Sequence, residues 1–153
     1  MGTNVAEVLS RSVCDTLQKV AFVFPEPAGK EALPPFRGPC ILARMRFGGC
    51  GSGELALAAP AALCHTLAAN ILGVEREDQR ANELGEDAFK EILDNLCAHL
   101  LLSLAGPEAL FDLGLPVQQN LSLAELDAFL EDPQSCGFSV EDQPVLARLV
   151  VEA

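Results

Sequence analysis

The sequence predicts a mixed α/β protein of the α+β kind, organised as a single domain over residues 1–153. Half of the 153 residues are hydrophobic, enough to form one substantial core. Residues 87–104 carry apolar side chains at helical spacing, which is typical of a long helix with one buried face. Residues 40–58 and 137–152 each have the pattern of two strands joined by a turn. The expected order is helix, hairpin, helix, long helix and hairpin.

The first elements expected are a helix, a short strand and a loop. Asn4 is suited to cap the helix N-terminus, and Glu7 stands three residues later to complete the capping pattern. Apolar residues then recur at helical spacing as far as Val20. Residues 22–24 form a candidate strand, and the proline-rich segment 25–39 is expected to be an irregular loop.

The glycine-rich segment Gly48–Gly53 lies between two candidate strands, residues 40–47 and 54–58, whose apolar residues alternate with more polar ones. Glycine-rich loops that hold phosphate normally open a helix or end in a lysine followed by serine or threonine. Because this segment joins two strands and lacks lysine, we expect it to be a hairpin turn.

The two central helices have clear signals at their ends. Pro60 is suited to the first position of a helix that runs to Leu72, and Gly73 is suited to end it. A polar stretch, residues 75–83, leads into the long helix. The pair at residues 106–107, glycine and proline, is expected to terminate that helix.

The C-terminal third is predicted to contain a strand, a short helix and the last hairpin. Residues 116–120 form the candidate strand. Ser122, with a glutamate three residues later, is typical of a capping box that opens a helix ending near Leu130. The hairpin over residues 137–152 is expected to turn near residues 142–144.

The charge balance excludes several classes of partner. The net charge of −12 arises from 22 acidic and 10 basic residues. Nucleic-acid binding requires cationic side chains that neutralise phosphates, so no nucleic-acid partner is expected. No apolar run approaches the roughly 20 residues that a membrane-spanning helix needs, and the N-terminus lacks the pattern of a secretory signal. We therefore expect a cytoplasmic protein that has no membrane partner.

The six cysteines are scattered and include no Cys-x-x-Cys pair, so neither a disulfide framework nor a zinc site is predicted. Two cysteines lie close to histidines, at Cys64–His65 and at Cys97 with His99. Neither spacing suits a common zinc site. We expect the protein to have no metal or cofactor of its own.

The polar face of the long helix carries the most specific signal in the chain. Polar residues on such a face are usually just solvated. Here an acidic residue, Asp87, precedes Glu91 by four positions, Asp94 follows three positions later, and small Ala98 follows one turn further on. This pattern resembles the signature helix of the CheC/CheX family of chemotaxis phosphatases. The family pattern is Asp or Ser, three residues, Glu, two residues, Asn, then an apolar run that includes a small residue.

The resemblance implies both a fold and a partner. It implies a two-layer fold in which long helices pack on one face of a mainly antiparallel sheet. The single signature motif is nearer to CheX than to CheC, which implies a homodimer. The partner implied is a CheY-like response regulator, which carries its own divalent metal and whose aspartyl phosphate the family hydrolyses.

The resemblance also assigns roles to the residues of the long helix. In the family, the motif Glu pairs with the active-site lysine of the partner, and the motif Asn orients the attacking water. Glu91 matches the first position, whereas Asp94 stands where the family has Asn, so these two are the candidate catalytic residues. Asp87, Asn95 and Ala98 are candidate partner-binding residues.

The departure at Asp94 leaves three alternatives open. Aspartate lacks the amide donor of asparagine, and its charge repels a phosphoryl group, but a carboxylate is also able to act as a general base. The chain is then a slow phosphatase, with Asn95 as a second candidate amide. Alternatively it is a catalytically inactive regulator-binding or scaffolding module of the same fold. A third alternative is a homodimeric structural domain whose acidic face is only solvated.

Overall fold

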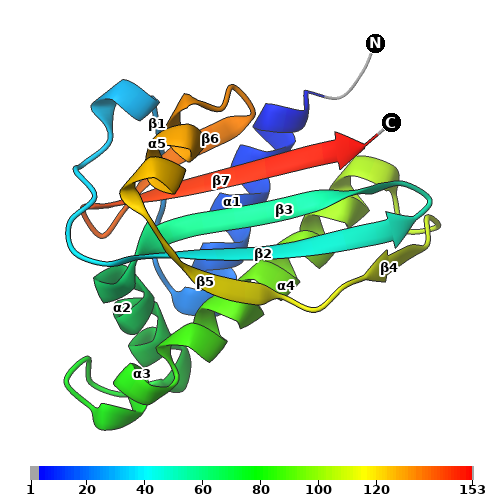
Figure 1. Cartoon of the computed structure of the whole chain (residues 1–153). Coiled ribbons are helices and arrows are strands. Elements are labelled where there is room, and N and C mark those ends of the chain that lie inside the picture. The colour runs from blue at the N-terminus through cyan, green and yellow to red at the C-terminus, as the bar shows by residue number, and fades with distance from the viewer. Residues whose placement is uncertain (1–3, 153) are drawn as a thin grey trace.

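The computed structural model describes residues 4–152, apart from the side chain of residue 86. Seven strands form one sheet, and every strand pair is antiparallel. The strand order is β1-β6-β7-β3-β2-β4, and β5 also pairs with β2 (Figure 1). The strands are β1 (Glu26–Ala28), β2 (Cys40–Gly49), β3 (Ser52–Pro60), β4 (Phe111–Leu113), β5 (Val117–Leu121), β6 (Ser135–Val140) and β7 (Gln143–Glu152).

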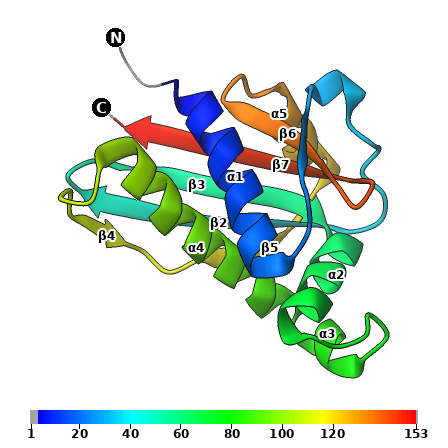
Figure 2. The same cartoon turned by 180° about the vertical axis from the view of Figure 1, so that it is seen from behind.

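Helices cover one face of this sheet, as Figure 2 shows from behind. Helices α1 and α4 run across it, with α2 beside α4 and the short α3 at the far end. Among the described residues, α5 is the one α-helix on the opposite face. The predicted two-layer α+β fold, with long helices on one face of a mainly antiparallel sheet, is therefore confirmed. The helices are α1 (Val5–Ala21), α2 (Ala61–Leu72), α3 (Gln79–Glu83), α4 (Gly85–Ala105) and α5 (Leu123–Glu131), and a 3-10 turn spans Lys30–Ala32.

The alternation of side chains along the central strands creates two cores. Along β2, Ile41, Ala43 and Met45 face the large core beneath α1, α2 and α4. Leu42 faces the opposite side of the sheet, where it packs in a smaller core with Phe129 of α5. This strict period of two is what a sheet covered on both faces requires.

Burial of one side of α4 determines which side faces outward. Phe89, Ile92, Leu93, Leu96 and Leu100 are each at most 2% exposed within the large core. Because side chains three and four positions apart share a helix face, this packing turns the polar residues of α4 away from the sheet. The fold thereby presents the candidate site residues to solvent.

The predicted ends of three helices are confirmed. The Asn4 side chain accepts a hydrogen bond from the Glu7 amide at the start of α1. Ser122 and Glu125 form a complete capping box at the start of α5. Gly73 ends α2 in a left-handed conformation, with φ of 69°. These signals are local, so the sequence specifies them without help from the tertiary structure.

The prediction for residues 22–29 is wrong. Residues 22–24 form no strand: Phe22 is the left-handed C-cap of α1, and only Val23 turns inward to the core. The expected loop that follows contains β1, which pairs with residues 137–139 of β6. The pairing depends on a strand more than 100 residues away, so local composition does not reveal it.

Smaller differences occur elsewhere. Pro60 is the last residue of β3 and lies at the N-cap position, immediately before α2, whereas the sequence predicts it at the first position of that helix. The polar stretch 75–83 contains the short helix α3, which the sequence does not predict. The strand β4 is also absent from the sequence-based prediction. The last hairpin turns at Glu141 and Asp142, which both have positive φ, as a tight two-residue turn requires.

The tight packing of the first hairpin supports a stability prediction. A Cβ atom on Gly53 would lie 2.2 Å from the Val150 carbonyl oxygen and 2.7 Å from Cζ of Phe47, whereas a Cβ on Gly48 would meet nothing within 4 Å. We expect Gly53→Ala to lower the free energy of unfolding by about 1–3 kcal/mol and Gly48→Ala to change it by less than about 0.5 kcal/mol. Urea denaturation of both variants measures the difference. Equal losses would contradict the packing described here.

None of the described helices combines the length and the apolar character that crossing a bilayer requires.

Candidate functional site

The outward face of α4 is a continuous stripe of exposed side chains, here called the α4 stripe. It contains all five residues that the sequence singled out, and each of them is exposed. Its members are Asp87, Glu91, Asp94, Asn95 and Ala98. Residues three and four apart on a helix lie next to each other on one face, so Glu91 has Asp87 one turn before it and Asp94 one turn after it. The predicted residues are therefore brought together.

The two candidate catalytic carboxylates are free. Within the part of the chain that the structure describes, the carboxylates of Glu91 and Asp94 make no hydrogen bond and no ion pair. Asp87 lies 3.9 Å from the Lys90 amine in a loose contact on the helix surface. Two free carboxylates about one turn apart are able to accept a cation or hydrogen-bond donors from another molecule.

Asn95 faces away from Asp94, toward α1. Its side-chain amide donates a hydrogen bond of 2.9 Å to the backbone carbonyl of Glu91, within its own helix. It lines a small hollow of about 180 Å³ together with Lys19 of α1 and His99. Successive helix residues are about 100° apart, so Asp94 and Asn95 flank Glu91 on opposite sides. In this arrangement the amide of Asn95 is not directed to the side where Asp94 stands.

His99 is half-buried against α1, and its Nε2 atom lies 3.6 Å from a carboxylate oxygen of Asp15. This contact links α4 to α1 beside the α4 stripe. The imidazole therefore packs between two helices and is not directed at the free carboxylates of Glu91 and Asp94.

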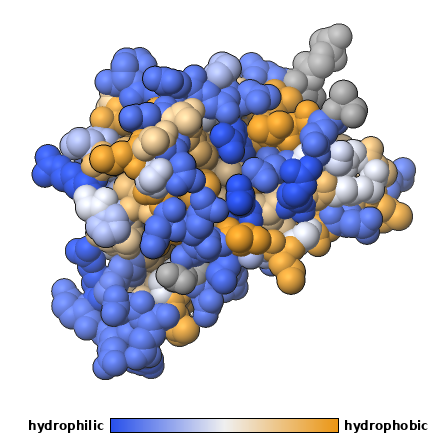
Figure 3. Space-filling model, in the orientation of Figure 1, coloured by the Kyte–Doolittle hydropathy of each residue, from blue (hydrophilic) through white to orange (hydrophobic). Residues whose placement is uncertain are grey.

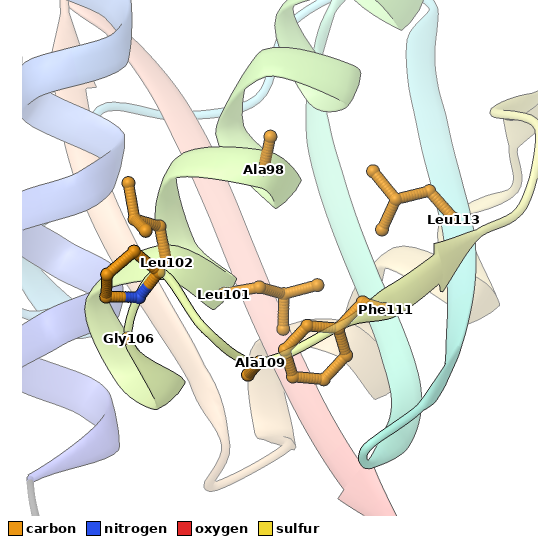
Figure 4. A pocket seen from close by; sticks show the side chains of 8 residues that line it. Ala98, Leu101, Leu102, Gly106, Ala109, Phe111 and Leu113 are labelled. Atoms are coloured by element: carbon orange, nitrogen blue, oxygen red, sulfur yellow. The ribbon is translucent and has the colours of Figure 1, made fainter.

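On the Asp94 side, an open apolar groove of about 280 Å³ separates α4 from β4; we call it the α4–β4 groove. In Figure 4 the side chains of Leu101 and Phe111 face each other across it, and Ala98 and Leu113 lie further along. Sequence reasoning did not identify this groove, because β4 was not expected and the groove exists only where β4 lies beside α4. Its main lining residues are Ala98, Leu101, Leu102, Ala109, Phe111 and Leu113.

Cys97 lies on the buried side of α4, close to Asp94 of the α4 stripe. Burial, and then the charge of Asp94, raise the pKa of the Cys97 thiol to about 11. Because the thiolate is the reactive form, Cys97 is almost wholly unreactive near neutral pH. We expect iodoacetamide at pH 8 to modify Cys50, which is exposed in the first hairpin, at least about 100-fold faster than Cys97. Peptide mass spectrometry of the native protein measures both rates, and rapid modification of Cys97 would contradict its burial.

The described residues form no candidate metal site. Among the residues that it covers, no group of three or more histidine, cysteine, aspartate or glutamate side chains is placed to hold a metal ion.

On the opposite face of the sheet, two of the basic residues, Arg46 and Arg148, form ion pairs. Arg46 lies 3.7 Å from Glu54, and Arg148 lies 3.2 Å from Asp132 and 4.6 Å above the ring of Phe129. Figure 3 shows that this face is mixed: hydrophilic residues are interrupted by hydrophobic patches, one of which lies over the segment that links β4 and β5.

The solved structures similar to this one include several chemotaxis proteins. No protein-family model matches the sequence, and no curated protein matches it. CheX from Desulfovibrio desulfuricans has a TM-score of 0.71 at 13% identity, with 98% of this chain and 100% of that chain covered. CheX from Vibrio vulnificus has a TM-score of 0.70 at 18% identity, with 98% and 100% covered. A chain of the CheX–CheY–BeF3–Mg2+ complex from Borrelia burgdorferi has a TM-score of 0.68 at 11% identity, with 98% and 99% covered.

The chain is therefore an α+β protein whose long helices cover one antiparallel sheet and present an acidic stripe to solvent. Its fold is that of the CheX and CheC-like chemotaxis proteins. This finding confirms, at the level of the fold, the resemblance carried by the residues of α4.

Proposed function

We propose that this protein binds a phosphorylated CheY-type response regulator through the α4 stripe and hydrolyses its aspartyl phosphate. The observation that carries the proposal is the pair of free carboxylates, Glu91 and Asp94, exposed one turn apart on the long helix of a CheX-like fold. One protein with this fold was solved in complex with CheY. By resemblance, Glu91 takes the position that pairs with the partner's active-site lysine.

The chemistry required of such an enzyme is limited. An aspartyl phosphate is an acyl phosphate, so a catalyst has mainly to position a water in line with the phosphorus and to hold the partner's site in place. Glu91 anchors the partner lysine by charge. Asp94 lies beside the phosphoryl group and accepts a proton from the attacking water as a general base. The divalent metal of the partner offsets part of the repulsion between the Asp94 carboxylate and the phosphoryl oxygens.

A second candidate function is a regulator-binding module without catalysis. The observation that favours it is Asp94 itself, since a carboxylate has no N–H with which to orient water where the family has an amide. Asn95 donates one N–H of its amide to the Glu91 carbonyl of its own helix, which leaves only the second N–H to take the place of the missing amide. In this case the α4 stripe still docks the regulator, and phosphate decay is unchanged.

The decay of a phosphorylated CheY-type receiver domain tests the proposal. We expect the wild-type protein to accelerate the decay and Glu91→Ala to remove the acceleration. Glu131→Ala is the matched control, because that glutamate is exposed at the end of α5 on the opposite side of the sheet. Acceleration that survives Glu91→Ala would contradict the role of the α4 stripe. Tight binding without acceleration would support the second function.

The homodimer and the cytoplasmic location stay predictions. So does the divalent metal, which we expect on the partner and not on this chain. Light scattering of the purified protein measures its oligomeric state directly.

A further inference from the structure

The α4 stripe alone is too small to hold a protein partner. A stable protein–protein interface buries about 800 Å² on each side, which is far more than a few side chains on one helix supply. A receiver domain that reaches Glu91 and Asp94 must therefore also cover one or both flanks of α4. The two flanks differ in chemistry, and this difference shows which one is the better candidate for the rest of the interface.

The flank toward α1 is polar and already engaged. His99 contacts Asp15 across the helices, and the amide of Asn95 is bonded within α4. A partner on this side would have to compete with these contacts. The flank toward β4 is the α4–β4 groove, which is lined by apolar side chains and open to solvent. The centre of an interface is typically apolar with a polar rim, and the groove side has this composition.

The groove is continuous with the α4 stripe. Ala98 belongs to both, and Leu102, which is 52% exposed, lies one turn further along α4. Leu101 stands seven residues beyond Asp94, which places it about 10 Å along the helix axis. Exposed acidic residues, Glu108 and Asp112, stand next to groove residues in the chain. These two residues extend the acidic surface of the α4 stripe to the groove, so one partner surface is able to contact both.

The β4 wall of the groove is held in place by contacts with the first hairpin. Phe111 packs edge-on against Phe47 of β2, with ring centres 6.0 Å apart. The Cys50 amide donates a hydrogen bond to the Leu110 carbonyl, and the Gly114 amide donates one to the Arg46 carbonyl. Because these contacts hold the loop before and after β4, binding in the groove requires little additional ordering, and preformed sites bind more tightly for that reason.

We propose that the α4–β4 groove receives an apolar side chain of the same phosphorylated receiver domain whose phosphoryl group faces Asp94, about 10 Å further along the axis of α4. This inference rests on the proposed function, since it extends the docking surface of the α4 stripe. The apolar anchor contributes affinity, and the acidic stripe provides the contact with the phosphorylated site.

A titration with a CheY-type receiver domain activated by beryllofluoride and Mg2+ tests this inference. Leu102→Asp and Leu113→Asp place a charge in the groove, at residues 52% and 42% exposed, and Leu123→Asp on α5, 80% exposed, is the matched control. We expect each groove variant to weaken binding about tenfold or more and the control to bind like the wild type. Circular dichroism of all three variants checks that they are folded.

A second measurement does not depend on the variants. In wild-type protein labelled at alanine methyl groups, we expect the signals of Ala98 and Ala109 to shift when the activated receiver is added. The signal of Ala128, exposed on α5, is the control and should not move.

The outcomes distinguish the two proposals. Receiver binding that Glu91→Ala weakens, but that neither groove variant changes, would overturn the groove inference alone. Groove variants that change only the oligomeric state, as measured by light scattering, would assign the groove to a second copy of this chain and would also overturn it. A wild-type protein that binds no activated receiver would overturn the proposed function together with this inference.

Discussion

Asp94→Asn is expected to increase the rate at which this protein hydrolyses the aspartyl phosphate of a receiver domain. The substitution keeps the shape of the side chain, removes a negative charge and adds an N–H donor. In a partly desolvated site, a carboxylate close to a phosphoryl group costs several kcal/mol of repulsion. Each 1.4 kcal/mol changes a rate about tenfold, so we expect an increase on the order of ten- to a hundredfold.

Phosphate decay of the receiver measures this rate, and Asp127→Asn provides the control. That aspartate is exposed on α5, so the same change of charge occurs on the opposite face of the sheet. We expect Asp127→Asn to leave the rate unchanged. A rate that falls in Asp94→Asn would contradict the expectation and would show that the gain from Asp94 as a general base outweighs the repulsion that its charge causes.

Phe89→Ala is expected to destabilise the protein strongly. Phe89 is 2% exposed and packs with Ile92 and Leu93 between α4 and the sheet. Removing a buried phenylalanine side chain typically costs about 3–5 kcal/mol through lost burial and the cavity that remains. Since small domains have a free energy of unfolding of only about 5–15 kcal/mol, this loss is a large part of the whole stability.

Urea denaturation compares this variant with Phe24→Ala. Phe24 is 76% exposed, so the same truncation should change the free energy of unfolding by less than about 1 kcal/mol. Similar losses in the two variants would contradict the placement of Phe89 in the core and, with it, the outward orientation of the α4 stripe.

The long helix α4 is the element that the sequence predicts best. Its buried and exposed faces follow from the spacing of apolar residues in one continuous segment, so Phe89 and Leu93 were expected inside and Glu91 outside. The caps at Asn4 and Ser122 were equally predictable, because each involves residues only three positions apart.

The short strands were not predictable in the same way. β1 and β4 have three residues each and exist because β6 and β2 supply their hydrogen-bonding partners. The α4–β4 groove has the same origin: Phe111 and Leu113 line a hollow only because β4 is placed next to α4. Tertiary contacts of this kind leave no periodic signal in a segment of three residues.

The sequence predicts that the five candidate residues lie on one exposed face of the long helix, and the structure places them there. Helix geometry predicts that Asp94 and Asn95 share the polar face but lie about 100° apart around the helix axis. The structure separates them: Asn95 turns toward α1 and bonds to the Glu91 carbonyl, whereas Asp94 lies on the side of the groove. The solved CheX structures share the fold at only 11–18% identity, so the fold is retained where few side chains are identical.

The most direct test of the α4 stripe is the affinity of the wild-type protein and of Glu91→Ala for one receiver domain, with and without beryllofluoride and Mg2+. We predict that the wild type binds the activated receiver at least about tenfold more tightly than the inactive one. We predict that Glu91→Ala, which leaves the core untouched, loses most of this preference. Equal affinity for both receiver states, or a preference that Glu91→Ala retains, would contradict the role of the α4 stripe in recognising a phosphorylated regulator.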